Sequence, residues 1–440
     1  MIFRIPKAHN AGGARRVLAA GLVLVLSLSV AACSSGGKGG TSGQNQATPQ
    51  KPIRVGFLSP ATGNAASSGQ DMANGWKLWW QQHGDEVAGR KVETIYYDTA
   101  SDPNTALTRA RKAVEQDQVD MIVGPYLANE GLAVAAYTTQ NKVPLFLPTV
   151  SADDLTQRKA NPYVIRVAGW TSSQTTHPAG EWAYDQGYRN VLTIANAYAF
   201  GYENAGGFAQ TFTEKGGKII KQIWSPLGTS DYSPYLSQIS AAKPDAVFVE
   251  MVGADAVHFL EQWKSFGLKD KIPLIGNETL TDQSNVRKLP VDVASGITTF
   301  GHYAEGRDDQ ATKTFVDAYA AAYGVYPSYM AAAAFTNGQW ISQAILQVKG
   351  DLSNKDAFLD AMRAVKLDNS AFGPMTMDKY GNPVENVYIR KTVPAPDSSK
   401  AGVWNVVEKT YPNVSQFWTY KPEDYLQQPV YSDKFQGIKQ

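Results

Sequence analysis

The chain has 440 residues, of which 43% are hydrophobic and 18% are charged, so it can bury a substantial core in two or three domains. This composition excludes wholesale disorder, because disordered chains are poor in apolar residues. The formal net charge is +1 and Lys and Arg form no dense patch, which argues against a nucleic-acid-binding protein.

The N-terminal residues are typical of an exported chain. Basic residues precede VLAAGLVLVLSLSV, residues 17–30, an apolar run too short to span a bilayer comfortably. Small residues then lead to Cys33, the only cysteine, in an arrangement that resembles the lipobox of bacterial lipoproteins. The resemblance implies a signal peptide over 1–32, lipid on Cys33 and a body anchored to the bacterial cell membrane, outside the cytoplasm. The alternative is a plain secretory signal.

Residues 33–51 are expected to form a flexible tether, because SSGGKGGTSGQNQATPQ offers almost nothing apolar to bury. Since no second cysteine follows, the folded body has to be stable without disulfides.

Short apolar strands alternate with helices in the first part of the body. The predicted strands are IRVGFLSP, KVETIYYDT, VDMIVGP and VPLFLPT. The predicted helices cover 70–82, a stretch from the Asp102-Pro103 pair to about 116, and 130–141. Asp102 before Pro103 is a typical helix start. The alternation predicts a parallel sheet with helices on both faces.

The same alternation begins again after YVIRVAGW. Helices are expected over 174–186, 202–215, 232–242 and 255–266, with the strands NVLTIAN, KIIKQIWS, DAVFVEM and IPLIGN between and after them. GITTFGHY then leads to helices over 310–323, 329–348 and 355–365, and the tail carries short strands such as NVYIRKT and GVWNVVEKT. The fold class is therefore α/β, with two doubly wound parallel-sheet lobes.

Enzyme signatures are missing from this sequence. None of the five histidines belongs to an HExxH pair, and there is no G-x-S-x-G, no GxxxxGK[ST], and no GxGxxG after a strand. His302 is more typical of a wall or hinge residue than of a metal ligand. We expect no catalytic residues, no metal and no cofactor.

The loops after the strands are rich in hydroxyls, amides and aromatic rings instead. Ligands of open α/β sheets bind at these loops, and the mixture suits a small-molecule cleft. Helix N-termini at the same place would favour a carboxylate. Ordinary caps and turn formers are the alternative interpretation. The residues are Ser59, Thr62, Tyr126, Asn129, Thr149, Ser151, Trp170, Ser173, Tyr198, Phe200, Asn277, Glu278 and Thr279.

Several blocks resemble one known family. IRVGFLSPATG, YYDTASDPNTALTRARKAVEQDQVDMIVGP, VPLFLPTVSADDLT and FVDAYAAAYGVYPSYMAAAAF are similar to the Leu/Ile/Val-type substrate-binding proteins of ABC importers. The resemblance implies a type I periplasmic-binding (Venus-flytrap) fold with three hinge crossings, near 169–171, 300–303 and 384–387. Lobe one would comprise 52–169 and 303–385, and lobe two would comprise 170–302 and 386–440 with the tail.

The family's site carries over to some positions and not to others. Ala128 stands where the amino-acid binders have a serine for the ligand carboxylate, with Tyr126 and Asn129 beside it. Thr149 and Ser151 match the next loop of the site. The remaining ligand-binding candidates are Trp170, Tyr198, Phe200 and Glu278. Phe200 stands where the family usually has a tyrosine, and Glu278 stands where the branched-chain binders have a glutamate against the ammonium group of the ligand.

These differences from the family's site leave the chemical class of the ligand open. An acid at 278 favours a branched-chain or other amino acid, because a buried cation needs a partner. The aromatic residues favour an aromatic or aliphatic carboxylate equally well.

The resemblance implies a lipid-anchored receptor that delivers its ligand to the permease and ATPase subunits of an ABC importer. A sensor of the same fold signalling to a membrane receptor or kinase is the alternative, and a hydrolase using Glu278 with a bound water is a further one. We expect a monomer that binds no nucleic acid.

Overall fold

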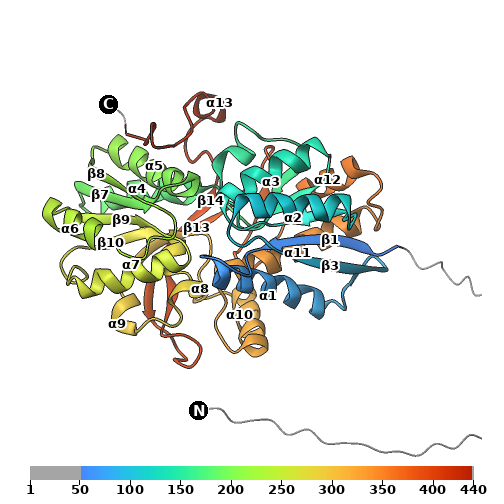
Figure 1. Ribbon diagram of the computed structural model, residues 1–440, viewed down its shortest axis with the longest axis horizontal. Helices are drawn as coiled ribbons and strands as arrows, with labels where there is room; N and C mark the ends of the chain where they lie inside the picture. The colour runs from blue at the N-terminus through green and yellow to red at the C-terminus, as the bar shows by residue number, and fades with distance from the viewer. Residues whose placement is uncertain (1–50, 439–440) are drawn as a thin grey trace, which may run out of the picture. The chain divides into compact units, whose positions relative to one another are not determined.

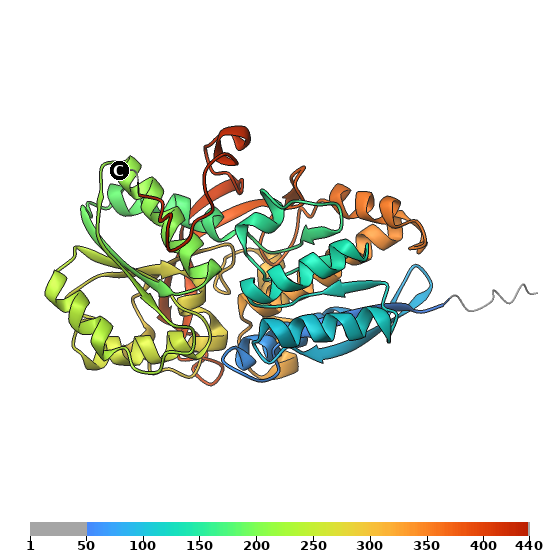
Figure 2. The same cartoon turned by 45° about the horizontal axis from the view of Figure 1, so that its top comes forward.

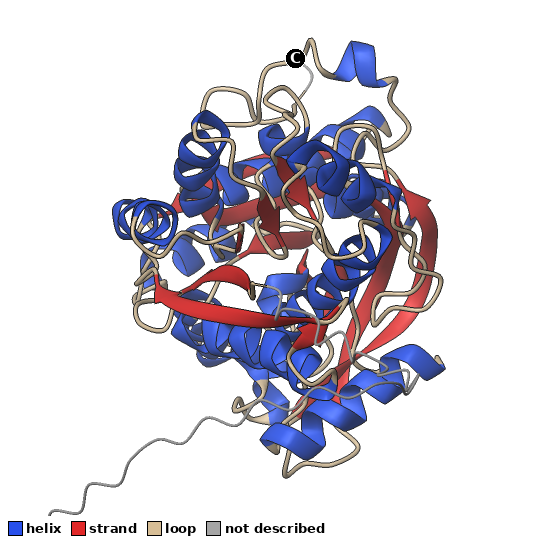
Figure 3. Cartoon of the chain, turned by 90° about the vertical axis from the view of Figure 1, so that its right-hand side faces the viewer, coloured by secondary structure: helices blue, strands red, loops and turns tan. Residues whose placement is uncertain are grey.

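The computed structural model describes residues 51–438. The predicted signal peptide, Cys33 and all of the predicted tether except Lys51 lie outside the described residues. Within the described part, no helix is long and apolar enough to cross a membrane. The body contains two β-sheets, each with its own helices (Figures 1 and 3).

The first sheet has the strand order β2-β3-β1-β4-β5-β6, and every neighbouring pair except β2–β3 is parallel. We call this sheet and its helices lobe one. Its strands are β1 (Ile53–Ser59), β2 (Glu86–Val87), β3 (Arg90–Asp98), β4 (Met121–Val123), β5 (Leu145–Leu147) and β6 (Val164–Arg166). Its helices are α1 (Ala66–Gln82), α2 (Pro103–Glu115), α3 (Ala128–Gln140), α10 (Gln310–Tyr323), α11 (Tyr329–Gln347) and α12 (Lys355–Ala364).

The second sheet has the order β12-β13-β11-β10-β9-β7-β8, with β14 also paired to β13. We call this sheet and its helices lobe two. Its strands are β7 (Asn190–Asn196), β8 (Lys218–Ser225), β9 (Ala246–Glu250), β10 (Leu274–Asn277), β11 (Thr298–Gly301), β12 (Thr376–Met377), β13 (Pro383–Pro394) and β14 (Val403–Val414). Its helical elements are α4 (Ser172–Asp185), α5 (Ala199–Glu214), α6 (Ser233–Ala242), α7 (Ala254–Ser265), η2 (Glu278–Thr281), α8 (Gln283–Val286) and α9 (Val291–Ala294).

The C-terminal strands differ from the short strands expected there. β13 and β14 are 12 residues long each and pair antiparallel with one another, and β13 is antiparallel to β11. Consecutive strands joined by a short loop form a hairpin, whereas a parallel pair needs a long crossover. The second sheet is therefore mixed, with parallel strands from β8 to β11.

Local signals explain some helix starts. Asp102 caps α2, because its Oδ1 accepts a hydrogen bond from the Thr105 amide at 2.7 Å, and Pro103 is the first helical residue. The helices α1 and α5 begin at Ala66 and Ala199, earlier than the predicted residues 70 and 202. Neither start has a side-chain cap, so the sequence carried no cap signal there.

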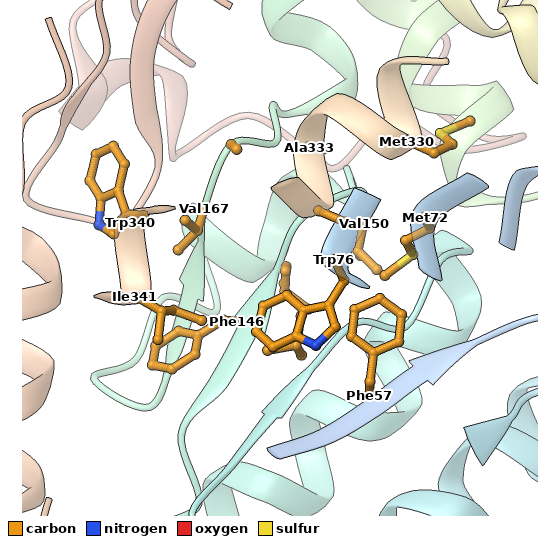
Figure 4. Packing of buried hydrophobic residues seen from close by; sticks show 14 of the residues in the cluster. Phe57, Met72, Trp76, Phe146, Val150, Val167, Met330, Ala333, Trp340 and Ile341 are labelled. Carbon is orange, nitrogen blue, oxygen red and sulfur yellow. The ribbon is translucent and has the colours of Figure 1, made fainter. Parts of the chain in front are cut away.

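Each sheet is covered on both faces. In lobe one, Phe57 of β1 and Phe146 of β5 pack with Trp76 of α1 and Trp340 of α11 in one core (Figure 4). In lobe two, alternate residues of β9 reach opposite faces: Val247 joins a core with α6 and α7, whereas Phe248 joins one with α4 and α5.

The chain passes three times between the lobes: after β6, after β11, and between α12 and β13. This confirms the predicted α/β architecture of two sheets. The exact residue limits proposed for the two lobes stay predictions.

Candidate ligand-binding cavity

A small cavity lies between the lobes. Loops at the carboxyl ends of strands from both sheets form its wall, as expected for α/β sheets. The lining residues are Tyr126, Leu127, Ala128, Thr149, Ser151, Tyr198, Phe200, Val252, Thr279 and Tyr329. Six of them belong to the nine predicted ligand-binding residues; Asn129, Trp170 and Glu278 do not line this cavity.

The loop after β4 forms one wall. Gly124 has φ +99°, and a Cβ there would lie 2.1 Å from the Leu58 carbonyl oxygen, so only glycine fits this turn. The carboxylate of Glu130 accepts hydrogen bonds from the amides of Leu127 and Tyr126, at 3.0 and 3.3 Å. Burial raises the pKa of Glu130 to about 7. Ala128 then begins α3 beside the cavity.

Asn129 lies one residue further along and does not line the cavity. Its side chain is half-buried, and its Oδ1 accepts a hydrogen bond from the Glu130 amide at 3.0 Å.

The loop after β5 adds two hydroxyl residues to the same wall. Thr149 donates from Oγ1 to the carbonyl of Pro125 at 3.3 Å, which joins the two lobe-one loops. The Ser151 carbonyl accepts hydrogen bonds from the amide and the hydroxyl of Ser172, both at 2.9 Å. Ser151 therefore fixes the cavity wall to the first turn of α4.

Lobe two contributes residues after three of its strands. Tyr198 and Phe200 follow β7 at the start of α5, Val252 follows β9 just before α7, and Thr279 follows β10 in η2. Phe200, Val252 and Thr279 are buried, and Tyr198 is half-buried at the edge.

Tyr329 completes the cavity from the start of α11. Its amide donates to Oδ2 of Asp282, in lobe two, at 2.9 Å. Burial raises the pKa of Asp282 to about 7. This hydrogen bond is one of several that connect the lobes around the cavity.

The electrostatics of the cavity suit an anion. No Asp, Glu, Lys, Arg or His is among the lining residues. Helices α3, α5, α7 and α11 all begin beside it, at Ala128, Ala199, Ala254 and Tyr329. A helix N-terminus carries a partial positive charge, although the Tyr329 amide of α11 and the Ala254 amide of α7 are already bound, to Asp282 and Asn64. The site can therefore hold a carboxylate without a basic side chain, against walls formed by aromatic rings.

Glu278 lies outside the cavity in a buried polar network. Its carboxylate accepts hydrogen bonds from Nδ1 of His302 at 2.6 Å and from the His302 amide at 3.1 Å. Nη1 of Arg390 lies 3.6 Å from the same carboxylate. A Cβ at Gly301 would lie 2.0 Å from the Glu278 Oε2, so glycine there leaves room for the carboxylate.

Trp170 also belongs to this network and not to the cavity wall. The centroid of its ring lies 4.2 Å from the centroid of the His302 ring. The Phe372 ring also stacks on the His302 ring, with the two centroids 4.5 Å apart. Because residues 170 and 302 lie at two of the three chain crossings, the network sits at the hinge.

Direct bonds join the lobes in this arrangement. The Ser67 hydroxyl donates to the Ser284 carbonyl at 2.8 Å, and the Ala254 amide donates to the Asn64 carbonyl at 3.2 Å. Arg287 pairs with Asp71, and its Nη1 lies 3.2 Å from Oδ1 of that residue. The structure is therefore closed around the cavity.

Four lining residues were not among the nine candidates: Leu127, Val252, Thr279 and Tyr329. Thr279 belonged to the wider set of loop residues. Only one indirect signal in the sequence pointed to Tyr329: Ser328 before it can cap a helix. In the structure, Oγ of Ser328 accepts a hydrogen bond from the Ala331 amide at 3.3 Å. Across residues 51–438, no three His, Cys, Asp or Glu side chains are grouped so that they could hold a metal ion.

Comparisons with known proteins agree with this arrangement. Residues 52–397 match the family described as periplasmic binding protein. Leu/Ile/Val-binding protein homolog 6 of Brucella melitensis is 26% identical over 353 residues, which are 79% of this chain and 89% of that relative.

Two solved structures from Rhodopseudomonas palustris are similar in sequence and fold. A solute binding protein of an ABC transporter from strain BisB5, in complex with 3,4-dihydroxybenzoic acid, is 30% identical with a TM-score of 0.78, covering 83% of this chain and 98% of that one. A second solute binding protein, in complex with benzoate, is 25% identical with a TM-score of 0.77, covering 88% and 100%. The family match, the two-sheet fold and these relatives confirm the resemblance: this chain belongs to the periplasmic binding protein family, with the type I fold of ABC-transporter solute-binding proteins.

Proposed function

We propose that this protein captures a small organic carboxylate between its two lobes and delivers it to the permease of an ABC importer. The observation that carries the proposal is the interlobe cavity, which has no charged side chain in its lining and lies beside the N-termini of four helices. An anion is stabilised there by backbone amides. Family membership implies an extracytoplasmic location.

An aromatic acid fits this cavity better than an α-amino acid. The ammonium group of an amino acid needs a carboxylate partner, and Glu278 is engaged by His302 and Arg390 instead. Tyr126, Phe200 and Tyr329 supply flat apolar surface. The two R. palustris relatives were solved with aromatic acids. The name of the Brucella relative keeps a branched-chain amino acid as the second candidate.

Ligand binding would act by favouring the closed arrangement. Residues of both lobes line the cavity, so a ligand that contacts both walls binds the closed form more tightly than an open one. The closed form would then be recognised by the permease. A micromolar affinity corresponds to about −8 kcal/mol, which a few hydrogen bonds and one buried ring supply.

Lipid on Cys33 would keep the receptor at the membrane beside its transporter. Cys33→Ser in the full chain should move the protein from the membrane fraction to the soluble fraction of the producing bacterium. Retention of this variant in the membrane would contradict the anchor without touching the ligand proposal.

A binding screen tests the ligand class. The protein is unfolded and refolded to remove any bound molecule, then melted with benzoate, hydroxybenzoates, aliphatic acids or leucine. A ligand at 100 times its Kd adds about 2.7 kcal/mol to the free energy of unfolding. We expect stabilisation by aromatic acids and none by leucine. Stabilisation by leucine alone would establish the amino-acid alternative.

A further inference from the structure

Thr279 holds a buried hydroxyl that has no hydrogen-bond partner within the described chain. Its amide donates to Oδ1 of Asn277 at 3.0 Å, and its carbonyl accepts from Nδ2 of Asn285 at 2.7 Å. The residue is 1% exposed, and its Oγ1 has no partner among the described atoms. A buried polar group without a partner costs about 1–3 kcal/mol, so this hydroxyl is a position where a ligand group would be stabilised.

Thr279 is also the one fully buried polar residue that lobe two places in the cavity lining. The other lobe-two residues of the lining are Phe200 and Val252, which are apolar, and Tyr198, which is half-buried. Glu278, the preceding residue, is turned toward His302. The ligand group that meets this wall is therefore a neutral hydrogen-bonding group and not an ammonium.

The carboxylate end belongs on the opposite wall. Phe200 and Val252 of the lobe-two wall are apolar and offer a carboxylate no side-chain donor. Lobe one offers the start of α3 at Ala128, together with Thr149 and Ser151.

We propose that Thr279 selects a ring hydroxyl on the ligand, so that the preferred solute is a hydroxylated aromatic monocarboxylate. Its carboxylate lies against the lobe-one wall and its hydroxyl bonds to Oγ1 of Thr279. This inference rests on the proposed function and specifies the solute class of the same cavity. It makes Thr279 a specificity-determining residue that contacts the ligand.

The test compares the Kd values of benzoate and of 2-, 3- and 4-hydroxybenzoate by titration calorimetry. In the unmodified protein, at least one hydroxybenzoate should bind about fivefold to tenfold more tightly than benzoate, the value of one neutral hydrogen bond. Thr279→Val keeps the shape of the side chain and removes the hydroxyl. This variant should lose the preference, so that the ratio of the Kd values of benzoate and the preferred hydroxybenzoate falls to about one.

Two further variants make the test specific. Thr279→Ser retains a hydroxyl and should retain the preference. Thr193→Val removes another buried, unpartnered lobe-two hydroxyl that does not line the cavity, and should change neither Kd.

The outcomes separate this inference from the proposed function. A preference that survives in Thr279→Val, or equal binding of benzoate and all three isomers, would overturn the role of Thr279 while aromatic-acid binding stands. If the unmodified protein binds leucine and none of the four aromatic acids, the aromatic-acid proposal fails as well.

Discussion

The carboxylate of Glu278 and the imidazole of His302 form a hydrogen bond of 2.6 Å, and both side chains are completely buried. Nη2 of Arg390 donates to the Glu278 carbonyl at 3.0 Å, and Nη1 donates to the Tyr303 carbonyl at 2.6 Å. These contacts connect the end of β10, the crossing after β11 and strand β13. Glu278 thus connects the elements of the hinge and does not line the cavity.

Glu278→Gln should destabilise the fold without removing ligand binding. Arg390 would lose one of its buried anionic neighbours. Glu305 also interacts with the charge of Arg390, which reduces the cost of burying the guanidinium without Glu278. We expect the free energy of unfolding in urea to fall by about 2–3 kcal/mol, and the Kd for the best aromatic acid to change by less than about threefold.

Glu93→Gln is the matched control, because Glu93 pairs with Arg54 at an exposed site and the pair contributes at most about 1 kcal/mol. Loss of aromatic-acid binding in a Glu278→Gln variant of normal stability would place Glu278 in the ligand site.

Glu250 should make stability fall as the pH rises. Burial raises its pKa from 4.5 to about 8. Between pH 5 and pH 8 the folded protein keeps a proton that the unfolded chain has released, so the free energy of unfolding decreases as pH increases. Glu130 and Asp282 act in the same direction, since burial raises the pKa of each to about 7.

Glu250→Gln removes this titration. The variant should become more stable than the unmodified protein as the pH rises from 5 to 8, by an amount on the order of 2–4 kcal/mol at pH 8. Urea unfolding at pH 5, 6.5 and 8 measures the difference. The exposed Glu261 of α7 provides the control Glu261→Gln, and a stability difference independent of pH would show that Glu250 is ionised throughout.

The ion pair between Asp71 of α1 and Arg287 should favour the closed form. It joins the two lobes, with side-chain exposures of 5% and 11%, and Tyr319 donates a further hydrogen bond to Asp71 at 3.2 Å. Asp71→Asn leaves Arg287 without its anion when the lobes are closed. We expect the Kd to rise about tenfold, equivalent to about 1.4 kcal/mol, and the ligand-free protein to be more open in X-ray scattering.

The exposed pair of Asp308 and Lys313 lies within lobe one, so Asp308→Asn is the control. An Asp71→Asn variant with an unchanged Kd would mean that this pair persists when the cavity opens.

Arg158 should hold the C-terminal segment, which we define as residues 415–438. The family match ends at residue 397. From lobe one, the Arg158 guanidinium donates to the carbonyls of Gln428 at 2.7 Å and Tyr425 at 3.2 Å. Figure 2 shows that the segment then continues to lobe two. There Tyr431 contacts Gln210 of α5, and its hydroxyl lies 3.1 Å from Nε2 of His177 in α4.

Arg158→Ala should therefore increase deuterium exchange across this segment and lower the Tm by a few degrees, since each lost charge-assisted hydrogen bond costs about 1.5–3 kcal/mol. Arg363→Ala is the matched control, because Arg363 also donates to backbone carbonyls but both of its acceptors belong to lobe one. Unchanged exchange in residues 415–438 would show that the aromatic contacts alone hold the segment.

The periodicity of the sequence predicted most helices and strands within a few residues. The helix over 310–323 has the predicted limits, and α11 ends one residue before the predicted 348. The long C-terminal hairpin was underestimated, because prolines interrupt its strand pattern and Pro383 and Pro394 nonetheless lie at the ends of β13. Pairing across a hairpin is decided between strands, and a single strand's sequence does not reveal it.

The sequence by itself determined that two α/β units would follow one another, and that hydroxyl and aromatic residues would gather at the strand ends, because both follow from local periodicity and chain direction. Only the tertiary structure decided which of two adjacent residues faces the cavity. Glu278 turns toward the hinge and Thr279 lines the cavity wall. Neighbouring side chains in a tight turn point in different directions, and the packing of Gly301, His302 and Arg390 fixes which one is withdrawn.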